Sequence, residues 1–371
     1  MTTHLFHRYA GSLLVLAASL TVHAQEAARE GIKVAVITNA GGAHLGAYFT
    51  GLAKTPEATS VVLADPDGAS EAMAREALGD KLTAVYTDRD EMLAKEKPAM
   101  ALVSVEAHQG PEEIGAALDA GCHVLAEKPA CVRASDFAAL VEKAESGNRH
   151  LMLALTNRLN PEVLKARALI AAGEIGAIYN TQVLFVKDQT RLKSPSHQAA
   201  WFSDKARAGG GYLAWLGIHW LDLAMYVTGS HVTHVAGFSG NVGGQPVNIE
   251  DSVAMSMQFD NGTFGTMTAG YYLKGGQETL LRIWGEKGWL EIASDAPGQV
   301  RWISTAAENP AVQHYDAPGG QSGYTGYVRA CVRASAGLEA PPMTGRDGLR
   351  VLEAIFGFYD AAGQGKTVAL D

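Results

Sequence analysis

The chain has 371 residues, 47% of them hydrophobic and 19% charged, so it can fill the cores of two ordinary domains and is neither disordered nor fibrous. A net charge of −9 without any dense run of Lys or Arg argues against nucleic acid as a partner. Three cysteines, Cys122, Cys131 and Cys331, cannot form a disulfide framework, and no Cys/His cluster has the spacing of zinc ligands, so no metal is expected.

Residues 1–24 have the pattern of a cleavable signal peptide. Arg8 precedes the apolar run Gly11–Val22, and Val22-His23-Ala24 resembles a cleavage site that is cut after Ala24. The run is shorter than the roughly 20 residues that a membrane-spanning helix needs. A buried N-terminal helix is the alternative interpretation. We therefore expect an exported, periplasmic protein, with no membrane span in the rest of the chain.

Residues 31–155 alternate predicted strands and helices, which indicates a parallel, doubly wound sheet. The strands are continuous apolar runs of the kind buried on both faces. They are predicted at Ile32–Thr38, Ser60–Asp65, Ala84–Tyr86, Pro98–Val105, Cys122–Ala126 and Leu151–Leu155, and the helices between them extend through about Lys54 and over Ala69–Leu78, Pro111–Ala120 and Ala134–Glu145.

Residues 156–371 change to an α+β pattern around a mostly antiparallel, open sheet. The clearest signal is the turn sequence Asp260-Asn261-Gly262 between two alternating strands, which predicts a hairpin. Further strands are predicted at Tyr179–Lys187, Ser252–Phe259, Thr263–Tyr272, Thr279–Trp284 and Gly288–Ile292, and helices at Pro161–Ala172, Tyr212–Thr228 and 346–363.

The turn after the first strand is a candidate pyrophosphate site. Small residues there would allow backbone amides and the next helix N-terminus to approach a phosphate, although an ordinary strand–helix turn explains the same residues. Asp65 ends the second strand 24 residues after Gly41 and could bond a ribose 2′-hydroxyl. Because an acid there repels a 2′-phosphate, NAD is favoured over NADP. The turn residues assigned to the cofactor are Thr38, Asn39, Gly41, Gly42 and Ala43.

Two further residues are candidates for acid–base chemistry. Lys128, in Glu127-Lys128-Pro129, follows a predicted strand and could bond a reacting hydroxyl; an exposed loop lysine is the alternative. His219 follows the triple glycine 209–211 on a predicted helix, shares a helix face with Trp215 and precedes Asp222 by three residues. A histidine titrates near neutral pH and suits general acid–base work, whereas a core histidine is the alternative.

The ordered set of motifs resembles the Gfo/Idh/MocA oxidoreductases, from about Ile32 to Leu370. The resemblance depends on Ala117–Pro129, on Asn157-Arg158-Leu159-Asn160-Pro161, on Glu174-Ile175-Gly176, on Trp201 with Gly209–Gly211, and on Glu250-Asp251, Gly285–Leu290 and Asp347-Gly348. It implies an N-terminal NAD-binding Rossmann domain over 31–155 and a C-terminal substrate and oligomerisation domain over 156–371. A homodimer or homotetramer through the C-terminal sheet is then expected.

The resemblance also implies site residues. Lys128 matches the family's lysine and His219 its catalytic histidine, whereas Trp215 stands where the family usually has an aspartate. Trp215 could stack on a sugar or simply fill space against the second domain. His108, Glu127 and Lys128 join the residues assigned to the cofactor, and the residues assigned to substrate are Asn157, Arg158, Trp201, Trp215 and His219.

The sequence therefore predicts an NAD-dependent oxidoreductase that transfers hydride from a sugar, cyclitol or related polyol, with tightly bound NAD. Two alternatives stay open. One is an NAD-dependent glycoside hydrolase that uses transient oxidation and a retained cofactor, which would suit a compartment without free NAD. The other is a non-catalytic nucleotide-binding relative, suggested by the altered glycine turn and by Trp215.

Overall fold

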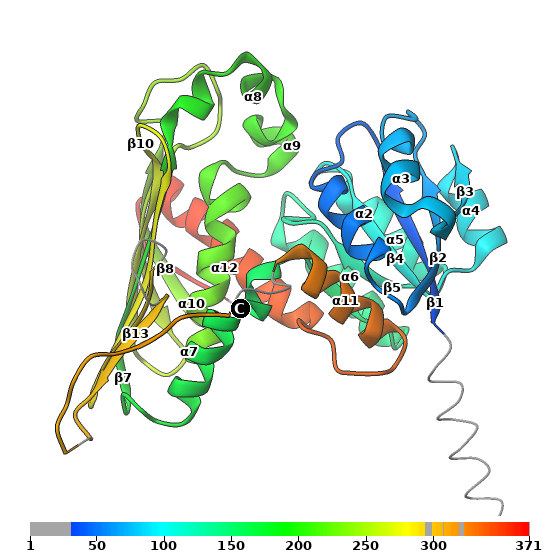
Figure 1. Ribbon diagram of the computed structural model, residues 1–371. Coiled ribbons are helices and arrows are strands. Elements are labelled where there is room, and N and C mark those ends of the chain that lie inside the picture. The colour runs from blue at the N-terminus through cyan, green and yellow to red at the C-terminus, as the bar shows by residue number, and fades with distance from the viewer. Residues whose placement is uncertain (1–30, 294–298, 307, 319–322, 371) are drawn as a thin grey trace, which may run out of the picture.

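The computed structural model describes residues 31–293, 299–306, 308–318 and 323–370. The predicted signal peptide lies outside these residues. Two sheets stand apart with a layer of helices between them (Figure 1). Among the described helices, none is long and apolar enough to cross a membrane.

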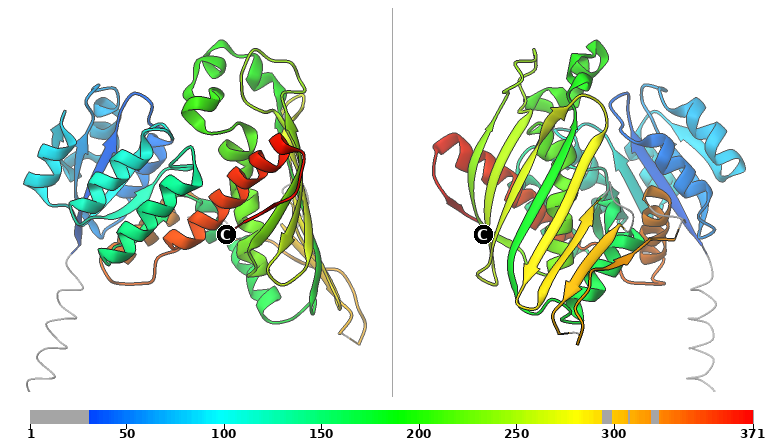
Figure 2. Two further views of the ribbon diagram at one scale, coloured as in Figure 1. Left: turned by 180° about the vertical axis from the view of Figure 1, so that it is seen from behind. Right: turned by 60° about the vertical axis from the view of Figure 1, so that its left-hand side comes forward.

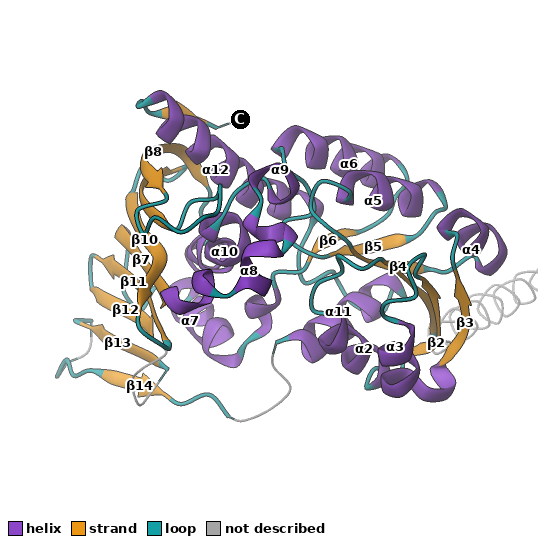
Figure 3. Ribbon diagram, turned by 90° about the horizontal axis from the view of Figure 1, so that it is seen from above, coloured by secondary structure: helices purple, strands orange, loops and turns teal. Residues whose placement is uncertain are grey.

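The first sheet has six parallel strands in the order β3-β2-β1-β4-β5-β6, which confirms the predicted doubly wound domain. Its strands are apolar runs because helices cover both faces (Figure 3). The strands are β1 Ile32–Thr38, β2 Ala58–Ala64, β3 Leu82–Tyr86, β4 Met100–Ser104, β5 His123–Ala126 and β6 Leu151–Leu153; the helices are α2 Leu45–Ala53, α3 Glu71–Leu78, η1 Gly79–Lys81, α4 Arg89–Glu96, α5 Gly110–Asp119 and α6 Ala134–Ser146.

The second sheet has nine strands in the order β14-β13-β12-β11-β7-β10-β9-β8-β15. It is antiparallel as predicted, except that β7 and β10 pair in parallel. The turn at 260–262 joins β9 to β10, as the sequence indicates. The strands are β7 Ile178–Asp188, β8 Val232–Gly240, β9 Ser252–Phe259, β10 Phe264–Leu273, β11 Gln277–Gly285, β12 Gly288–Ala293, β13 Val300–Ser304, β14 Gln313–Tyr315 and β15 Val368–Ala369.

Helices cover only the inner face of this sheet, toward the first domain, and the outer face carries no helix in the described part of the chain (Figure 2). Inner-face residues such as Val183, Leu281 and Ile283 are fully buried. The helical segments of the second half are η2 Thr156–Leu159, α7 Pro161–Ala171, η3 Gln189–Lys193, α8 Pro195–Ala199, η4 Trp201–Ser203, α9 Lys205–Ala208, η5 Leu213–Gly217, α10 Ile218–Thr228, α11 Tyr324–Ser335 and α12 Gly345–Gln364.

One late helix completes the first domain. Helix α11 lies against α2 (Figure 3), and Val328, Cys331 and Val332 belong to the same buried cluster as Val34 on β1. The Tyr327 hydroxyl donates to the carbonyl of Leu153 on β6 at 2.7 Å. The covering of the Rossmann sheet therefore includes a segment that is some 170 residues away along the chain.

The Tyr327 bond gives a stability test. We expect Tyr327→Phe to lower the free energy of unfolding by about 1 kcal/mol, because the Leu153 carbonyl loses its buried donor. Tyr179→Phe, at a side chain that is 60% exposed, is the control and should change it by less than about 0.5 kcal/mol. Urea unfolding of both variants measures the difference. Equal effects would contradict a stabilising role for the Tyr327 hydrogen bond.

Candidate active site

The turn between β1 and α2 is built for close backbone approach. A Cβ on Gly42 would lie 2.2 Å from the Thr38 hydroxyl oxygen, and one on Gly41 would lie 2.5 Å from the Cγ of Glu106. The Thr38 hydroxyl donates to the carbonyl of Ser104 at 2.7 Å, which fixes the end of β1 against β4. Glycine is required here by packing, which is the physical reason for the Gly41-Gly42 pair.

The amides of this turn already have protein partners. The Gly41 N–H donates to the Asn39 side chain and the Ala40 N–H to the Asp67 carboxylate, both at 2.9 Å. The Ala43 N–H donates to the Ser104 hydroxyl at 3.0 Å. A pyrophosphate at this turn would have to exchange places with these acceptors.

Asp65 lies directly after β2, as predicted, and is buried. Its Oδ2 accepts from the backbone and hydroxyl of Ser70, both at 2.7 Å, whereas its Oδ1 has no hydrogen-bond partner among the described residues. Ala64 and Pro66, on either side, line a cavity of about 290 Å³ together with Thr38. An unpartnered buried carboxylate oxygen beside a cavity fits the ribose hydroxyl of an adenosine group.

Glu127 and Lys128 follow β5, between β4 and β6, at the same carboxyl edge of the sheet. The Glu127 Oε2 accepts from the hydroxyl of Tyr48 at 2.5 Å and lies 3.1 Å from the His44 Nδ1, while its Oε1 is 3.8 Å from the Lys128 Nζ. Burial and the neighbouring Glu127 raise the pKa of Tyr48 well above its usual value. The Glu127 Oε2 therefore accepts a hydrogen bond from Tyr48, and its Oε1 lies near the Lys128 cation.

Lys128 is only 1% exposed. Its Nζ donates to the carbonyl of Trp215 at 2.7 Å and lies 3.3 Å from the centre of the Trp215 indole ring. Burial lowers the pKa of Lys128 to about 8, although Glu127 acts in the opposite direction. The structure thus places Lys128 behind Trp215, and direct contact with a substrate hydroxyl requires the indole to move.

An aromatic cluster, defined as His44, Trp201, Phe202 and Trp215, covers this lysine. The Trp215 ring stacks on Phe202 with centroids 4.6 Å apart and on His44 at 5.7 Å, and it meets Trp201 edge-on at 5.2 Å. The Trp201 indole N–H donates to the carbonyl of Gly41 at 2.9 Å. The cluster therefore joins the second domain to the glycine turn.

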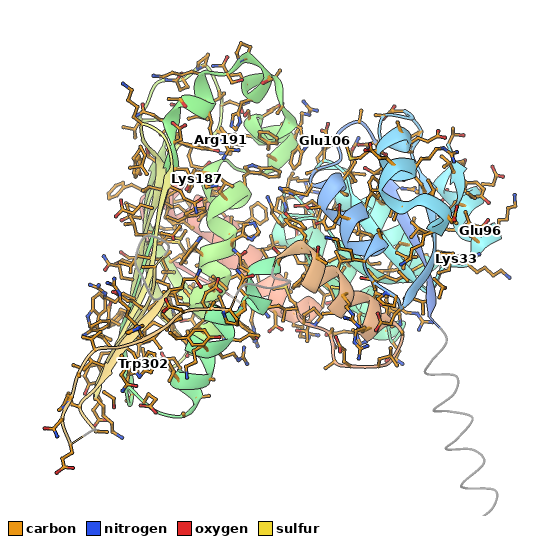
Figure 4. The ribbon with its side chains drawn as sticks, in the orientation of Figure 1. Lys33, Glu96, Glu106, Lys187, Arg191 and Trp302 are labelled. Carbon is orange, nitrogen blue, oxygen red and sulfur yellow. The ribbon has the colours of Figure 1, made fainter. Side chains whose placement is uncertain are left out.

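A second contact between the domains lies beside His108. Glu106 forms an ion pair with Arg207 on α9, and the His108 Nδ1 lies 3.4 Å from the same carboxylate. Figure 4 shows Glu106 at the edge of the first domain that faces α9. Because Glu106 also lies beside Gly41, His108 is close to the glycine turn.

The helix that carries His219 differs from the prediction of one α-helix over 212–228. Residues Leu213–Gly217 form a π-helical turn, in which the Ile218 N–H bonds the Leu213 carbonyl five residues earlier. The Glu250 carboxylate accepts from the N–H groups of Gly211 and Leu213 at 2.6 and 3.0 Å. The helix start is therefore fixed by a side chain from another segment, and π turns of this kind are frequent at functional sites.

His219 opens into a cavity of about 400 Å³ between α10 and the inner face of the nine-stranded sheet. Its Nδ1 has no hydrogen-bond partner among the described residues. Burial, together with the charges of Lys128, His44 and Lys187, lowers the pKa of His219 well below its usual value. The imidazole is therefore neutral near pH 7 and able to accept a proton.

The cavity brings together only part of the predicted substrate set. Asn157 and His219 line it, whereas Trp201 and Trp215 lie in the aromatic cluster instead. Sequence reasoning missed several polar residues of this cavity, namely Asn160, Glu162, Lys187, Gln277, Thr279, Gln299 and Tyr324. Lys187 could have been found, because it continues the inner-face series Val183–Phe185 of a predicted strand, where an apolar residue is expected.

Arg158 lies outside this cavity. Its guanidinium makes three hydrogen bonds of 2.6 to 3.0 Å to the carboxylate of Asp222, and both side chains are buried. Asp222 lies on α10 and Arg158 on η2, so the pair ties the start of the second domain to the His219 helix. The structure gives Arg158 a positioning role.

Among the described residues, no group of three or more His, Cys, Asp or Glu side chains is arranged to hold a metal ion. The residues do fit NAD at its adenosine end, given the cavity at Ala64–Pro66 and the unpartnered oxygen of Asp65.

A two-domain fold with a Rossmann sheet and an open mixed sheet defines a class of dinucleotide-dependent proteins. Residues 32–155 match the family model described as an oxidoreductase family with an NAD-binding Rossmann fold, and residues 163–291 match the GFO/IDH/MocA C-terminal domain. The chain therefore belongs to the Gfo/Idh/MocA oxidoreductase family, as the motifs predicted.

Similar proteins include a levoglucosan dehydrogenase from Pseudarthrobacter phenanthrenivorans, 28% identical over 42% of this chain and 44% of the relative. A D-glucoside 3-dehydrogenase from Escherichia coli is 26% identical over 56% of this chain and 62% of the relative. The chain thus spans about half the length of the curated relatives it matches. A solved structure of levoglucosan dehydrogenase with NADH and L-sorbose has the same fold, with a TM-score of 0.81, 19% identity, and coverage of 91% of this chain and 99% of that one.

The buried pair of Arg158 and Asp222 gives a second stability test. We expect Asp222→Asn to lower the free energy of unfolding by about 3–5 kcal/mol, because the buried guanidinium keeps its charge without its counter-ion. Asp119→Asn, which removes an exposed partner of Lys143, is the control and should cost less than about 1 kcal/mol. Similar losses of unfolding free energy in the two variants, measured by urea unfolding, would show that the buried pair contributes no more to stability than the exposed one.

Proposed function

We propose that the protein is an NAD-dependent dehydrogenase that oxidises a hydroxyl group of a sugar, cyclitol or related polyol. The observation that carries the proposal is the neutral, unpartnered Nδ1 of His219 in a polar cavity. The cavity lies close enough to the carboxyl edge of the Rossmann sheet for Lys128 to affect the pKa of His219. Relatives named as dehydrogenases of levoglucosan and of D-glucosides support the substrate class.

The residues have distinct roles in this proposal. Bound NAD supplies a hydride acceptor. Asp65 and the turn at 38–43 hold its adenosine and phosphate groups. His219 accepts the proton of the substrate hydroxyl at Nδ1, which has no competing partner. Lys128 acts from behind Trp215: its charge adds to burial in lowering the pKa of His219, and its bond to the Trp215 carbonyl fixes the π turn before His219.

We also propose export with cleavage after Ala24, to a periplasm, and a homo-oligomer formed through the C-terminal sheet. Strands of that sheet carry the exposed aromatic side chains Tyr179, Phe238 and Phe264, at 60%, 79% and 59%. Exposed aromatic side chains on a flat sheet face are typical of an interface between subunits.

The proposal is tested on the exported protein purified without added cofactor. Bound NAD(H) released on denaturation, and steady NADH formation on a panel of sugars and cyclitols, are the expected results. Cleavage of aryl glycosides without net NADH would identify the hydrolase instead. Binding of NAD without turnover of any sugar or glycoside would identify the non-catalytic nucleotide-binding relative, and failure to bind NAD at millimolar concentration would contradict both enzyme hypotheses.

The pH dependence of kcat/KM tests the role of Lys128. A lowered His219 pKa means that protonation stops the reaction only at acid pH, so the acid limb should lie below the ordinary histidine value of about 6.5. Lys128→Met removes a neighbouring positive charge, and the acid limb should therefore move upward, toward that value.

Lys128→Arg, which keeps the charge, is the matched control and should leave the acid limb at low pH. His219→Ala should abolish turnover while NADH binding, followed by fluorescence, is retained. An acid limb that stays at the same pH in Lys128→Met would show that the charge of Lys128 does not act on the proton acceptor.

A further inference from the structure

The polar end of the His219 cavity is formed by the sheet. Along β7 and β11 the inner-face residues are apolar apart from the buried Thr181, until Lys187, Gln277 and Thr279 take these positions at the cavity. Lys187 and Gln277 are direct cross-strand neighbours, and Thr279 pairs with Phe185. Three polar side chains therefore occupy positions that the strand pattern would otherwise give to the core.

Two of these polar groups have no hydrogen-bond or ion-pair partner among the described residues, although the Lys187 Nζ lies 5.7 Å from the centre of the Phe185 ring. Thr279 is 2% exposed, and its hydroxyl makes no hydrogen bond among the described residues. No carboxylate lies within ion-pair distance of Lys187 in that same part of the chain, and burial lowers its pKa. Buried polar groups usually have partners, because an unsatisfied one costs free energy. An unpartnered ammonium beside an unpartnered hydroxyl indicates a ligand that supplies an acceptor.

The neighbours of Lys187 do not supply that acceptor. Arg191, on η3, is a second cation, and Figure 4 shows both side chains at the same end of the sheet. Lys128 lies near enough for its charge to act on the same cavity. Among the described lining residues Glu162 is the carboxylate, and it lies on the first turn of α7 without an ion pair to Lys187. The end of the cavity at Lys187 is thus positively charged.

We propose that the substrate carries an anionic group, a carboxylate or a phosphate, that pairs with Lys187. This inference rests on the proposed function and narrows its substrate class from sugars and polyols to acidic sugars. The anion bonds the Lys187 ammonium and accepts from the Thr279 hydroxyl, while the reacting hydroxyl faces His219 in the same cavity. A charge-assisted bond of this kind is roughly twice as strong as a neutral one.

The test compares matched substrates on the NAD-loaded protein. Glucose, glucuronate and glucose 6-phosphate differ at one carbon, and galactose and galacturonate form a second pair. We expect kcat/KM for NADH formation to be about tenfold or more higher for an acidic sugar than for its neutral partner, as one charge-assisted bond implies. The uronate and phosphate arms distinguish a carboxylate from a phosphate. Equal or higher kcat/KM for the neutral sugars would overturn the proposal.

Variants at Lys187 separate this role from a structural one. Lys187→Met should lower kcat/KM for the acidic sugar about tenfold or more relative to its neutral partner, mainly through KM. Lys187→Arg should retain the preference. Lys193→Met removes an exposed cation of η3 outside the cavity and is the matched control. Equal losses for acidic and neutral sugars in Lys187→Met would overturn the proposal.

Calorimetric binding to the same NAD-loaded protein separates the two proposals. If no sugar gives NADH, the proposed dehydrogenase activity fails, but binding of glucuronate or glucose 6-phosphate still tests Lys187. Binding that Lys187→Met weakens and Lys193→Met preserves would support the anion site. Absence of binding of every acidic sugar, or binding that Lys187→Met leaves unchanged, would overturn it.

Discussion

The site depends on one contact, between the buried ammonium of Lys128 and the carbonyl and indole ring of Trp215. Removing an ammonium from water is costly, and this one is stabilised by a backbone acceptor at 2.7 Å, an aromatic face and the nearby Glu127. Because Lys128 follows a strand of the Rossmann sheet and Trp215 precedes His219, the same contact joins the two domains. It also places a positive charge that, together with burial, lowers the pKa of His219.

The sequence predicted the elements well where local pattern determines them. Apolar runs such as Ile32–Thr38 are buried on both faces and read as parallel strands, and Asp260-Asn261-Gly262 predicted its hairpin. Local pattern could not predict that β7 pairs in parallel with β10, or that α11 covers the first sheet, because both depend on segments far apart in the chain. The π turn was not predicted for the same reason. Glu250 accepts from the Gly211 N–H at the start of the helix, and Lys128 donates to the Trp215 carbonyl within the turn, and both come from distant segments.

The candidate site was predicted in part. Asp65 and Lys128 follow strands of the Rossmann sheet and His219 lines the cavity against the second sheet, and their assignment as site residues stays a prediction. Residue type alone does not show where a side chain points. The sequence assigned Arg158 to the substrate together with Asn157, but in the structure Arg158 pairs with Asp222 and only Asn157 lines the cavity. Whether a cofactor and a substrate occupy the positions assigned to them remains a prediction of this geometry.

The charges of the site follow one logic. Trp215 introduces no negative charge beside His219, and the apolar cover of the aromatic cluster keeps water from Lys128, so its field acts over a longer range than in solvent. His219 is a neutral base and can accept a proton without first losing one. Lys187 is a cation that has no ion-pair partner among the described residues. A cavity that is lined by one proton acceptor and by one cation without an ion-pair partner is complementary to a molecule that has both a hydroxyl and an acidic group. The arrangement of charge thus restricts the substrate more narrowly than the fold does.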